Sequence, residues 1–401
     1  MTRLLIDLTH TSHTQAQTGI QRVCRSLYAA LAGRGEELLP LTHDAYESAW
    51  RPLRNWERRN LAPPRGASAG ARGARWPLQA RISGRLRRWL GARGKPRSEP
   101  AISGRAFIEP EIFSPAAGRE LPRLLAGVSG PRVAIFHDAT ALRLPELSPT
   151  KTVARYPAYL QELLVFDGVA ANSKDSQAAL VDYWQWLGFA DPPPVISLAF
   201  GIDTPAPAPY GHTVAPQASP VVLSVGSIEG RKNHLALLEA CERLWQRGLR
   251  FELRLIGLCH PQTGRAAIER LRALQAAGRD LRYEGPASEA GLQDAYRTCV
   301  FTVYPSLMEG FGLPVLESLS HGKPCICSAH GALGESARGG GCLALDRVDA
   351  PALADAIGSL LSDPDRLGRL TDDARSREFK TWSAYAGELV TWMDTLPRRG
   401  A

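Results

Sequence analysis

The chain has 401 residues and a formal net charge of +8, and a length of this kind favours two domains of roughly 200 residues over one. Its composition, with 44% hydrophobic and 22% charged residues, is typical of a globular protein and excludes a disordered or membrane-embedded chain. No apolar run of about 18 residues and no signal peptide is recognised, and the seven scattered cysteines lack C-x-x-C pairs, so we expect a cytosolic protein with reduced thiols.

The chain opens with an apolar stretch, Arg3 to Leu8, that predicts a β-strand. A polar loop follows and leads into a helix that begins near Thr18 or Gly19, with Val23 and Leu27 at helical spacing. A strand, a glycine loop and a helix are the usual start of a nucleotide-binding fold. The motif G-x-G-x-x-G is not present there, however, and a dinucleotide cofactor is therefore disfavoured.

Residues 50–100 differ from their surroundings in composition. Arg, Gly, Ala and Pro dominate, and residues 51–97 hold fourteen Lys and Arg against one Glu, so this segment makes the chain basic. Four tryptophans are interleaved: Trp50, Trp56, Trp76 and Trp89. We interpret the segment as a partly disordered insertion.

Within this insertion, residues 80–93 predict an amphipathic helix. Ile82, Leu86, Trp89 and Leu90 share one side, and arginines lie close by. Such a pattern suits an anionic membrane surface, which we expect residues 50–97 to contact. Two alternatives stay open: a flexible, solvated loop, and a nucleic-acid-binding segment in which Arg and aromatic side chains contact phosphates and bases.

The rest of the first half continues the strand and helix pattern. Residues 132–136 read as a buried parallel strand that ends in His137, and polar residues at such strand ends face the crevice of these folds. A strand and a helix capped by Ser173 or Asp175 come next. The Pro- and Ala-rich residues 204–219 then predict a stiff linker between two domains.

The second half restarts the alternation. Strands are predicted at residues 221–227, 251–257 and 282–286, and helices at 228–245, 264–278 and 289–299, which favours a parallel sheet with right-handed crossovers. Gly226 and Ser227 end the first of these strands, and Arg231 and Lys232 follow near the start of a helix. Two cations therefore lie where a diphosphate would bind.

The stretch from Val300 to Gly322 carries the clearest signal. Its first six residues, VFTVYP, predict a buried strand, and Gly310 and Gly312 then bracket Phe311 in a tight loop. Pro314 suits the first turn of a helix of about two turns.

Unpaired amides at a helix N-terminus favour an anion, so the backbone from Gly310 to Leu313 predicts a phosphate site. Glu309 lies just before the loop and Glu317 one turn into the helix, where carboxylates accept hydrogen bonds from hydroxyl groups. A sugar nucleotide combines hydroxyls with phosphate.

Taken together, PSLMEGFGLPVLESLSHGKP resembles the E-x7-E signature of retaining glycosyltransferases of the large GT4 family, which have the GT-B fold. LSVGSIEGRKN resembles the family segment that holds the donor diphosphate. The match is strong over residues 220–345 and weaker before them. It implies an α/β protein with an acceptor-side Rossmann-like domain at 1–203, a linker at 204–219, a nucleotide-sugar domain at 220–378, and a C-terminal helix at 379–401 that packs back on the first domain.

The resemblance also implies roles for single residues. Glu309 would bind hydroxyls of the donor sugar and Glu317 the ribose. Arg231 and Lys232 would stabilise the leaving diphosphate, although many members carry Arg where this chain has Ser227, so Arg231 is a candidate substitute. His137, close to the donor sugar in the family, is the remaining catalytic candidate. The other donor-binding candidates are Gly19, Gly226, Ser227, Gly310, Phe311, Gly312 and Leu313.

The expected activity is a retaining transfer of a hexose-type sugar, with mannose as a guess, from a nucleoside-diphosphate sugar to a glycan or polyprenyl-linked acceptor in surface polysaccharide assembly. No cofactor other than the donor is expected. No D-x-D motif follows an apolar strand, so no metal is required. We expect a peripheral protein on the cytoplasmic membrane face and no nucleic acid. The alternatives are a nucleotide-sugar epimerase or hydrolase on the same fold, and a non-enzymatic nucleic-acid-binding protein that uses the basic insertion.

Overall fold

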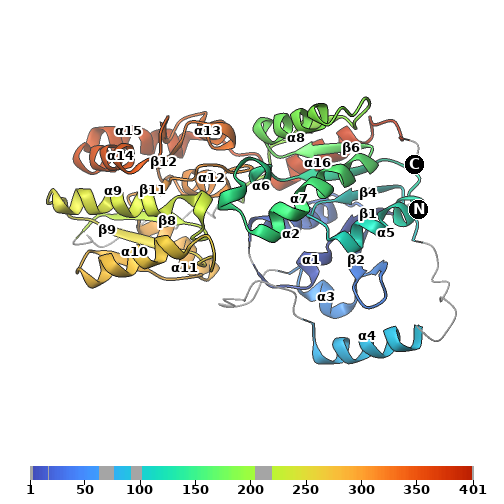
Figure 1. Cartoon of the computed structure of the whole chain (residues 1–401). Coiled ribbons are helices and arrows are strands. Elements are labelled where there is room, and N and C mark those ends of the chain that lie inside the picture. Colours follow the sequence, from blue (N-terminus) through green and yellow to red (C-terminus); the bar gives the residue numbers. More distant parts are fainter. Residues whose placement is uncertain (1–2, 17, 63–75, 92–101, 204–218, 400–401) are drawn as a thin grey trace.

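The structure, a computed structural model, describes residues 3–16, 18–62, 76–91, 102–203 and 219–399. The predicted linker at 204–219 therefore lies almost wholly outside the described residues, as do two parts of the basic insertion, 63–75 and 92–97. The described chain forms two lobes, each built on its own β-sheet with helices on both faces (Figure 1).

The N-terminal lobe contains a seven-stranded sheet among the described residues, in the order β3-β2-β1-β4-β5-β6-β7. Its strands are β1 (Leu4–Asp7), β2 (Leu38–Asp44), β3 (Ala49–Pro52), β4 (Ala106–Glu109), β5 (Arg132–Phe136), β6 (Gly168–Ala171) and β7 (Val195–Ser197). All neighbours pair in parallel except β2 and β3, which are antiparallel. The central strands are buried along their whole length, as expected for a sheet covered by helices on both faces.

The C-terminal lobe repeats this plan with six strands in the order β10-β9-β8-β11-β12-β13, all parallel. They are β8 (Val221–Val225), β9 (Glu252–Ile256), β10 (Leu281–Tyr283), β11 (Phe301–Tyr304), β12 (Cys325–Ser328) and β13 (Cys342–Leu345). The order of the strands reverses between β8 and β11. Crevices that bind ligands in such sheets lie at this switch point, beyond the carboxyl ends of the strands.

The helices fill the crossovers, as the alternating pattern predicts. Those of the N-terminal lobe are α1 (Thr9–Ser12), α2 (Gly19–Gly33), α3 (Asn55–Arg59), α4 (Leu78–Gly91), α5 (Pro115–Leu125), α6 (Thr140–Arg143), α7 (Thr150–Glu162) and α8 (Lys174–Trp186). Those of the C-terminal lobe are α9 (His234–Gln246), α10 (Arg265–Ala276), α11 (Glu289–Thr298), α12 (Leu313–Ser320), α13 (Gly331–Ala337), α14 (Ala350–Ser362) and α15 (Pro364–Ser376). Short 3₁₀ turns lie at Pro145–Leu147, Leu163–Val165 and Gly230–Lys232. No helix among the described residues is both long and apolar enough to cross a membrane.

The last helix, α16 (Trp382–Met393), returns to the N-terminal lobe, as predicted. Tyr385, Leu389 and Met393 are buried in one cluster with Leu4 and Leu27 of β1 and α2. In Figure 1 this red helix lies within the blue and green lobe. The apolar side of α16 thus completes the core under the N-terminal sheet and joins the two ends of the chain.

The structure corrects the interpretation of residues 50–62 as part of a loose basic insertion. Trp50 is 7% exposed and packs edge-on against Phe107, with ring centroids 6.4 Å apart, so it does not contact a membrane. Arg51 is also buried, and its guanidinium contacts Asp44 at 2.8 Å and Glu57 at 2.7 Å. These residues belong to the folded lobe because β3 pairs with β2, and two carboxylates neutralise the arginine.

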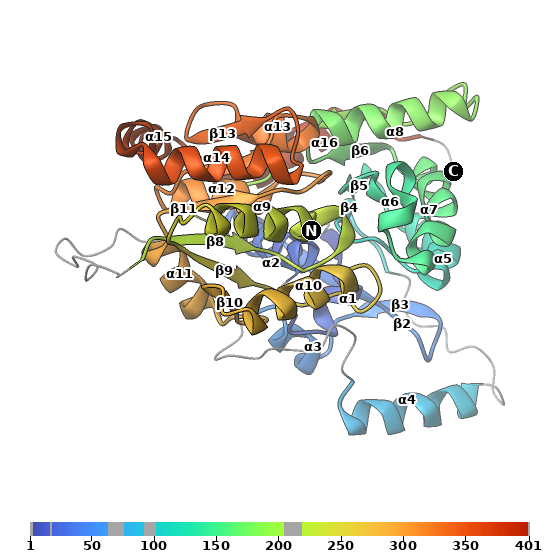
Figure 2. The same ribbon diagram turned by 60° about the vertical axis from the view of Figure 1, so that its left-hand side comes forward.

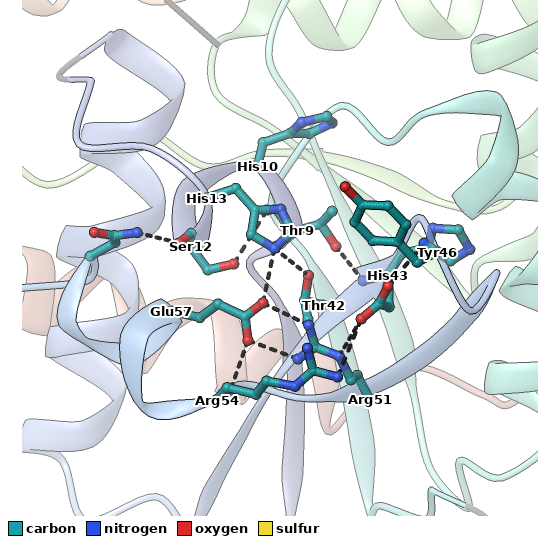
Figure 3. A network of polar contacts seen from close by, with 12 residues as sticks. Thr9, His10, Ser12, His13, Thr42, His43, Tyr46, Arg51, Arg54 and Glu57 are labelled. Atoms are coloured by element: carbon teal, nitrogen blue, oxygen red, sulfur yellow. Dashed lines mark hydrogen bonds and ion pairs between the residues drawn. The ribbon is translucent and has the colours of Figure 1, made fainter. Parts of the chain in front are cut away.

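The same polar network holds the loop after β1 (Figure 3). His13 Nε2 lies 3.0 Å from Glu57 Oε1 and 3.5 Å from the Thr42 hydroxyl. Trp56 and Trp76 pack on the His13 ring, with centroids 5.5 and 4.4 Å away. Two of the four interleaved tryptophans therefore cover a histidine of the N-terminal lobe.

Candidate functional site

Two loops meet at the switch point of the C-terminal sheet. One leaves β8 and contains Gly226, Ser227 and the 3₁₀ turn Gly230–Lys232. The other leaves β11 at Pro305 and ends at Gly312, where α12 begins. Because β8 and β11 are neighbours in the sheet, these loops lie side by side although they are far apart in sequence.

Glu309 joins the two loops through a pair of cations. Its Oε1 lies 2.6 Å from Lys232 Nζ, and its Oε2 lies 2.7 Å from Arg231 Nη1. Burial raises the pKa of this carboxyl, but the charges of Arg231 and Lys232 outweigh it and lower the pKa to about 2. Glu309 is therefore a carboxylate at neutral pH, held in place by both predicted diphosphate ligands.

Lys232 is the more deeply placed of the two cations. It is 7% exposed, contacts the Tyr304 hydroxyl at the end of β11, and lies 4.5 Å from the centroid of that ring. Burial lowers its pKa, whereas Glu309 raises it. The charge of Glu309 thus offsets only part of the effect of burial on the Lys232 pKa, and the second cation, Arg231, does not lose its proton in proteins.

The glycine loop has the conformation that its sequence predicts. Gly312 caps α12 in the left-handed region, with φ of 98°, which other residues rarely adopt. Among the described residues, no acceptor takes the backbone N–H groups from Gly310 to Leu313. These amides are thus available to an anion at the N-terminus of an eight-residue helix.

Glu317 connects this helix to the other lobe. Its Oε1 lies 2.6 Å from Arg22 Nη1 of α2, and the Tyr296 hydroxyl donates to its Oε2 at 3.3 Å. The charge of Glu317 raises the pKa of Arg22. Both side chains line a small pocket between the lobes together with Ser26, Asp203, Leu313 and Trp382. Arg22 of α2 therefore brings a cation from the N-terminal lobe to this pocket.

His137 lies at the carboxyl end of β5, next to the glycine loop, but its ring points elsewhere. Nε2 lies 2.7 Å from the Pro110 carbonyl oxygen, and burial lowers its pKa. The main chain of His137 is what meets the loop, because a Cβ on Gly310 would lie 1.9 Å from its carbonyl oxygen. The glycine at 310 therefore permits the two lobes to approach.

The other candidates lie around the same crevice in different ways. Gly19 is the first residue of α2, and a Cβ there would meet nothing within 4 Å, so the space beside it is open. Ser227 donates to Glu229 at 3.0 Å, and Glu229 pairs with Arg231 at 3.0 Å. The Phe311 ring packs edge-on against Phe200 of the N-terminal lobe, and the Phe311 side chain is therefore engaged in the contact between the lobes.

Sequence reasoning missed three side chains of this crevice: Tyr304, Tyr296 and Glu229. Tyr304 is the last residue of a buried strand, and from this position its hydroxyl reaches the crevice. A polar residue at the end of a predicted strand was therefore a signal that the sequence offered. Tyr296 lies on α11, where only the packing of α11 beside α12 brings its hydroxyl to Glu317.

Buried acids hold the facing loop of the N-terminal lobe. Asp7 and Glu109 end β1 and β4, and Glu111 accepts the backbone N–H groups of His10 and Thr11 at 2.6 and 2.7 Å. Burial and the charge of Glu111 raise the pKa of Asp7 to about 8. The acids thus fix the path of the loop after β1, and nothing in their spacing predicted this.

The crevice of the C-terminal lobe is the part of the chain with a recognisable family pattern. Residues 212–377 match the family described as glycosyl transferases group 1. We call these matched residues the group 1 domain. The group 1 domain contains Arg231, Lys232, Glu309 and Glu317 and both loops of the crevice.

Curated relatives of the chain are glycosyltransferases. The serotype-specific mannosyltransferase WbdA of Escherichia coli is 25% identical over 343 residues, which is 81% of this chain and 38% of that protein. The D-inositol 3-phosphate glycosyltransferase of Thermobispora bispora is 30% identical over 264 residues, 62% of this chain and 60% of that protein. The chain thus matches less than two thirds of the length of either relative.

Solved structures confirm the predicted GT-B fold for the whole chain. Sucrose-phosphate synthase from Thermosynechococcus elongatus superimposes with a TM-score of 0.68 at 19% identity, over 98% of each chain. Anabaena HepE, solved in complex with UDP and glucose, gives 0.64 at 14% identity, over 99% of this chain and 100% of that one. At these identities the likeness concerns the fold alone.

Proposed function

We propose that the protein is a retaining glycosyltransferase that takes a hexose from a nucleoside-diphosphate sugar. The observation that carries this proposal is the Glu309 cluster, in which a carboxylate and two cations lie beside unpaired amides at the switch point of the group 1 domain. A sugar nucleotide needs acceptors for its hydroxyls and positive groups for its diphosphate, and the cluster supplies both within one crevice.

In the proposed complex the donor redistributes the partners of this cluster. Lys232 and Arg231 turn to the diphosphate, with the amides of Gly310 to Leu313, and Glu309 accepts hydrogen bonds from sugar hydroxyls. Glu317 accepts hydrogen bonds from the ribose. Breaking the sugar–phosphate bond leaves negative charge on the departing oxygen, and cations fixed at that point stabilise it.

The proposed transfer occurs on one face of the sugar. The departing phosphate takes the proton of the acceptor hydroxyl, so the proposal requires no protein nucleophile and no metal. The acceptor is a glycan or a polyprenyl-linked glycan used in surface polysaccharide assembly. We place the protein at the cytoplasmic face of a membrane, as a peripheral protein, because a lipid-linked acceptor is presented there.

A screen of nucleoside diphosphates and nucleotide sugars tests the proposal. Ligand at about a hundred times its Kd stabilises a protein by about 2.7 kcal/mol, which thermal denaturation detects. We expect one donor to raise Tm in the native chain and to lose this effect in Lys232→Met. The control is Lys323→Met, a part-buried lysine that donates to the Cys299 carbonyl outside the crevice.

Product analysis with the donor found in this way decides the reaction. Transfer to an acceptor with the anomeric configuration kept supports the proposal. Inversion refutes the retaining mechanism, whereas epimerised or only hydrolysed sugar assigns the crevice to the alternative enzymes. A screen in which no nucleotide shifts Tm refutes the donor site.

A further inference from the structure

Helix α4 is attached to the N-terminal lobe through its smallest residues. Ala80 is buried, and Gly84, one turn later, lies so close to Tyr46 that a Cβ would be 2.6 Å from a ring carbon. Tyr46 in turn packs edge-on against Trp76, with centroids 5.2 Å apart. The side of α4 that contains Ala80 and Gly84 therefore faces the protein.

The large apolar residues of α4 lie on the opposite side. Leu78, Ile82, Leu86 and Trp89 are 68, 59, 54 and 53% exposed. At about 100° per residue, these four positions form one stripe, and its centre lies about half a turn from Ala80 and Gly84. Among the described residues, the other exposed large hydrophobic side chains lie elsewhere in the chain: Val165, Trp186, Phe189, Leu235 and Leu307. We call Leu78, Ile82, Leu86 and Trp89 the α4 stripe.

The charge beside the α4 stripe is positive. Arg81 and Arg85 are exposed on the helix, and its sequence, LQARISGRLRRWLG, contains no acidic residue. Figures 1 and 2 both place α4 at the margin of the N-terminal lobe, beyond α3. An amphipathic helix with a cationic flank binds in the headgroup region of an anionic bilayer, where its apolar side is buried and its arginines pair with lipid phosphates.

We propose that the α4 stripe docks the protein on an anionic lipid surface, with Arg81 and Arg85 at the lipid headgroups. The arginines favour a lipid surface over a second protein. Lipid headgroups offer phosphates to Arg81 and Arg85, whereas an apolar protein surface that covered the α4 stripe would bury both cations. The α4 stripe would be the surface through which the protein reaches the membrane, and it rests on the proposed function only for this membrane location. Lipid binding is measured without any sugar transfer, so the two fail separately.

Vesicle sedimentation with the full chain tests the proposal. We expect binding to vesicles of phosphatidylcholine mixed with phosphatidylglycerol, weak binding to phosphatidylcholine alone, and release in high salt. Ile82→Glu combined with Leu86→Glu should lower the partition coefficient at least about tenfold, because two side chains no longer enter the bilayer. Arg81→Glu combined with Arg85→Glu should lower it by a similar factor at low salt.

The matched control is Trp186→Glu on α8. Trp186 is 79% exposed, more than any residue of the α4 stripe, and its helix α8 lies on the opposite side of the N-terminal lobe from α4 in both views. This variant should bind vesicles like the native chain, and all variants should keep donor binding and circular dichroism. All substituted side chains are exposed, so folding is not at risk.

Four results would overturn the proposal. Equal binding to neutral and anionic vesicles would remove the role of the arginines, and unchanged binding in both double variants would remove the role of α4. A native dimer that Ile82→Glu with Leu86→Glu converts to monomer, without vesicle binding, would assign the stripe to a second copy of the chain. Salt-sensitive RNA binding in place of vesicle binding would assign it to nucleic acid.

Discussion

Replacing Glu309 by glutamine tests the central ion cluster, because the amide keeps the size of the side chain and removes its charge. The pKa of Glu309 falls from its usual value of 4.5 to about 2 on folding, and one unit corresponds to about 1.4 kcal/mol. The ionised carboxyl therefore contributes about 3 kcal/mol to the free energy of unfolding at neutral pH. Its folded pKa lies below the unfolded one, so this contribution is present above pH 4.5 and disappears as the pH falls toward 2.

We expect Glu309→Gln to lower the free energy of unfolding by about 3 kcal/mol at pH 7, measured by urea denaturation followed by circular dichroism. The difference from the native chain should shrink as the pH falls from about 5 to about 3, since the Glu309 carboxyl of the unfolded chain then takes up a proton while that of the folded chain stays ionised. The variant should also lose at least about a hundredfold in turnover with the donor.

The control for this experiment is Glu239→Gln. Glu239 forms a surface ion pair with Arg270 at 2.8 Å, and pairs of this kind contribute about 1 kcal/mol or less. A free energy of unfolding for Glu309→Gln within about 0.5 kcal/mol of the native value at pH 7 would refute a stabilising role of the ionised carboxyl, because substitutions at ordinary exposed sites have effects of that size. A difference that stays constant between pH 5 and 3 would contradict the assigned pKa.

The remaining predictions concern the proposed reaction. Lys232→Ala should lower kcat at least about a hundredfold with the fold intact, and a folded variant with near-native kcat/KM would remove Lys232 from the mechanism. Glu317→Ala should act on donor affinity and leave kcat nearly unchanged, since the ribose is remote from the reacting carbon; unchanged affinity in calorimetry would argue against a ribose contact. Dialysis against a chelator should leave the transfer rate unchanged, and a loss that Mg²⁺ or Mn²⁺ restores would show that a metal takes part.

Much of the fold was predictable because its signals are local. From β8 to α12, each strand and helix of the C-terminal lobe follows from a short run of apolar residues, and the parallel order follows from their alternation. Ser173 caps α8 through its side chain, as expected from its position before the helix. The antiparallel strand β3 was not predicted, because AWRP is too short for a periodic pattern and lies among basic residues.

The candidate site was predictable as a set of residues but not as an arrangement. The glycine loop before α12 and the cations after β8 are sequence features, and parallel strands bring them to the same edge of the sheet. That both cations pair with Glu309 depends on the packing of two loops that are more than seventy residues apart.

The sequence by itself determined the two repeated β/α units, the left-handed turn at Gly312 and the chemical character of the crevice, since these depend on backbone sterics and on residue type. Only the tertiary structure decided which polar groups meet: Arg22 with Glu317 across the lobes, and the His137 ring with Pro110 instead of the crevice. It also decided that Trp50 is buried whereas the α4 stripe is exposed. The physical reason is that desolvation and ion pairing depend on distances between segments that are remote in the chain, and no local pattern encodes those distances.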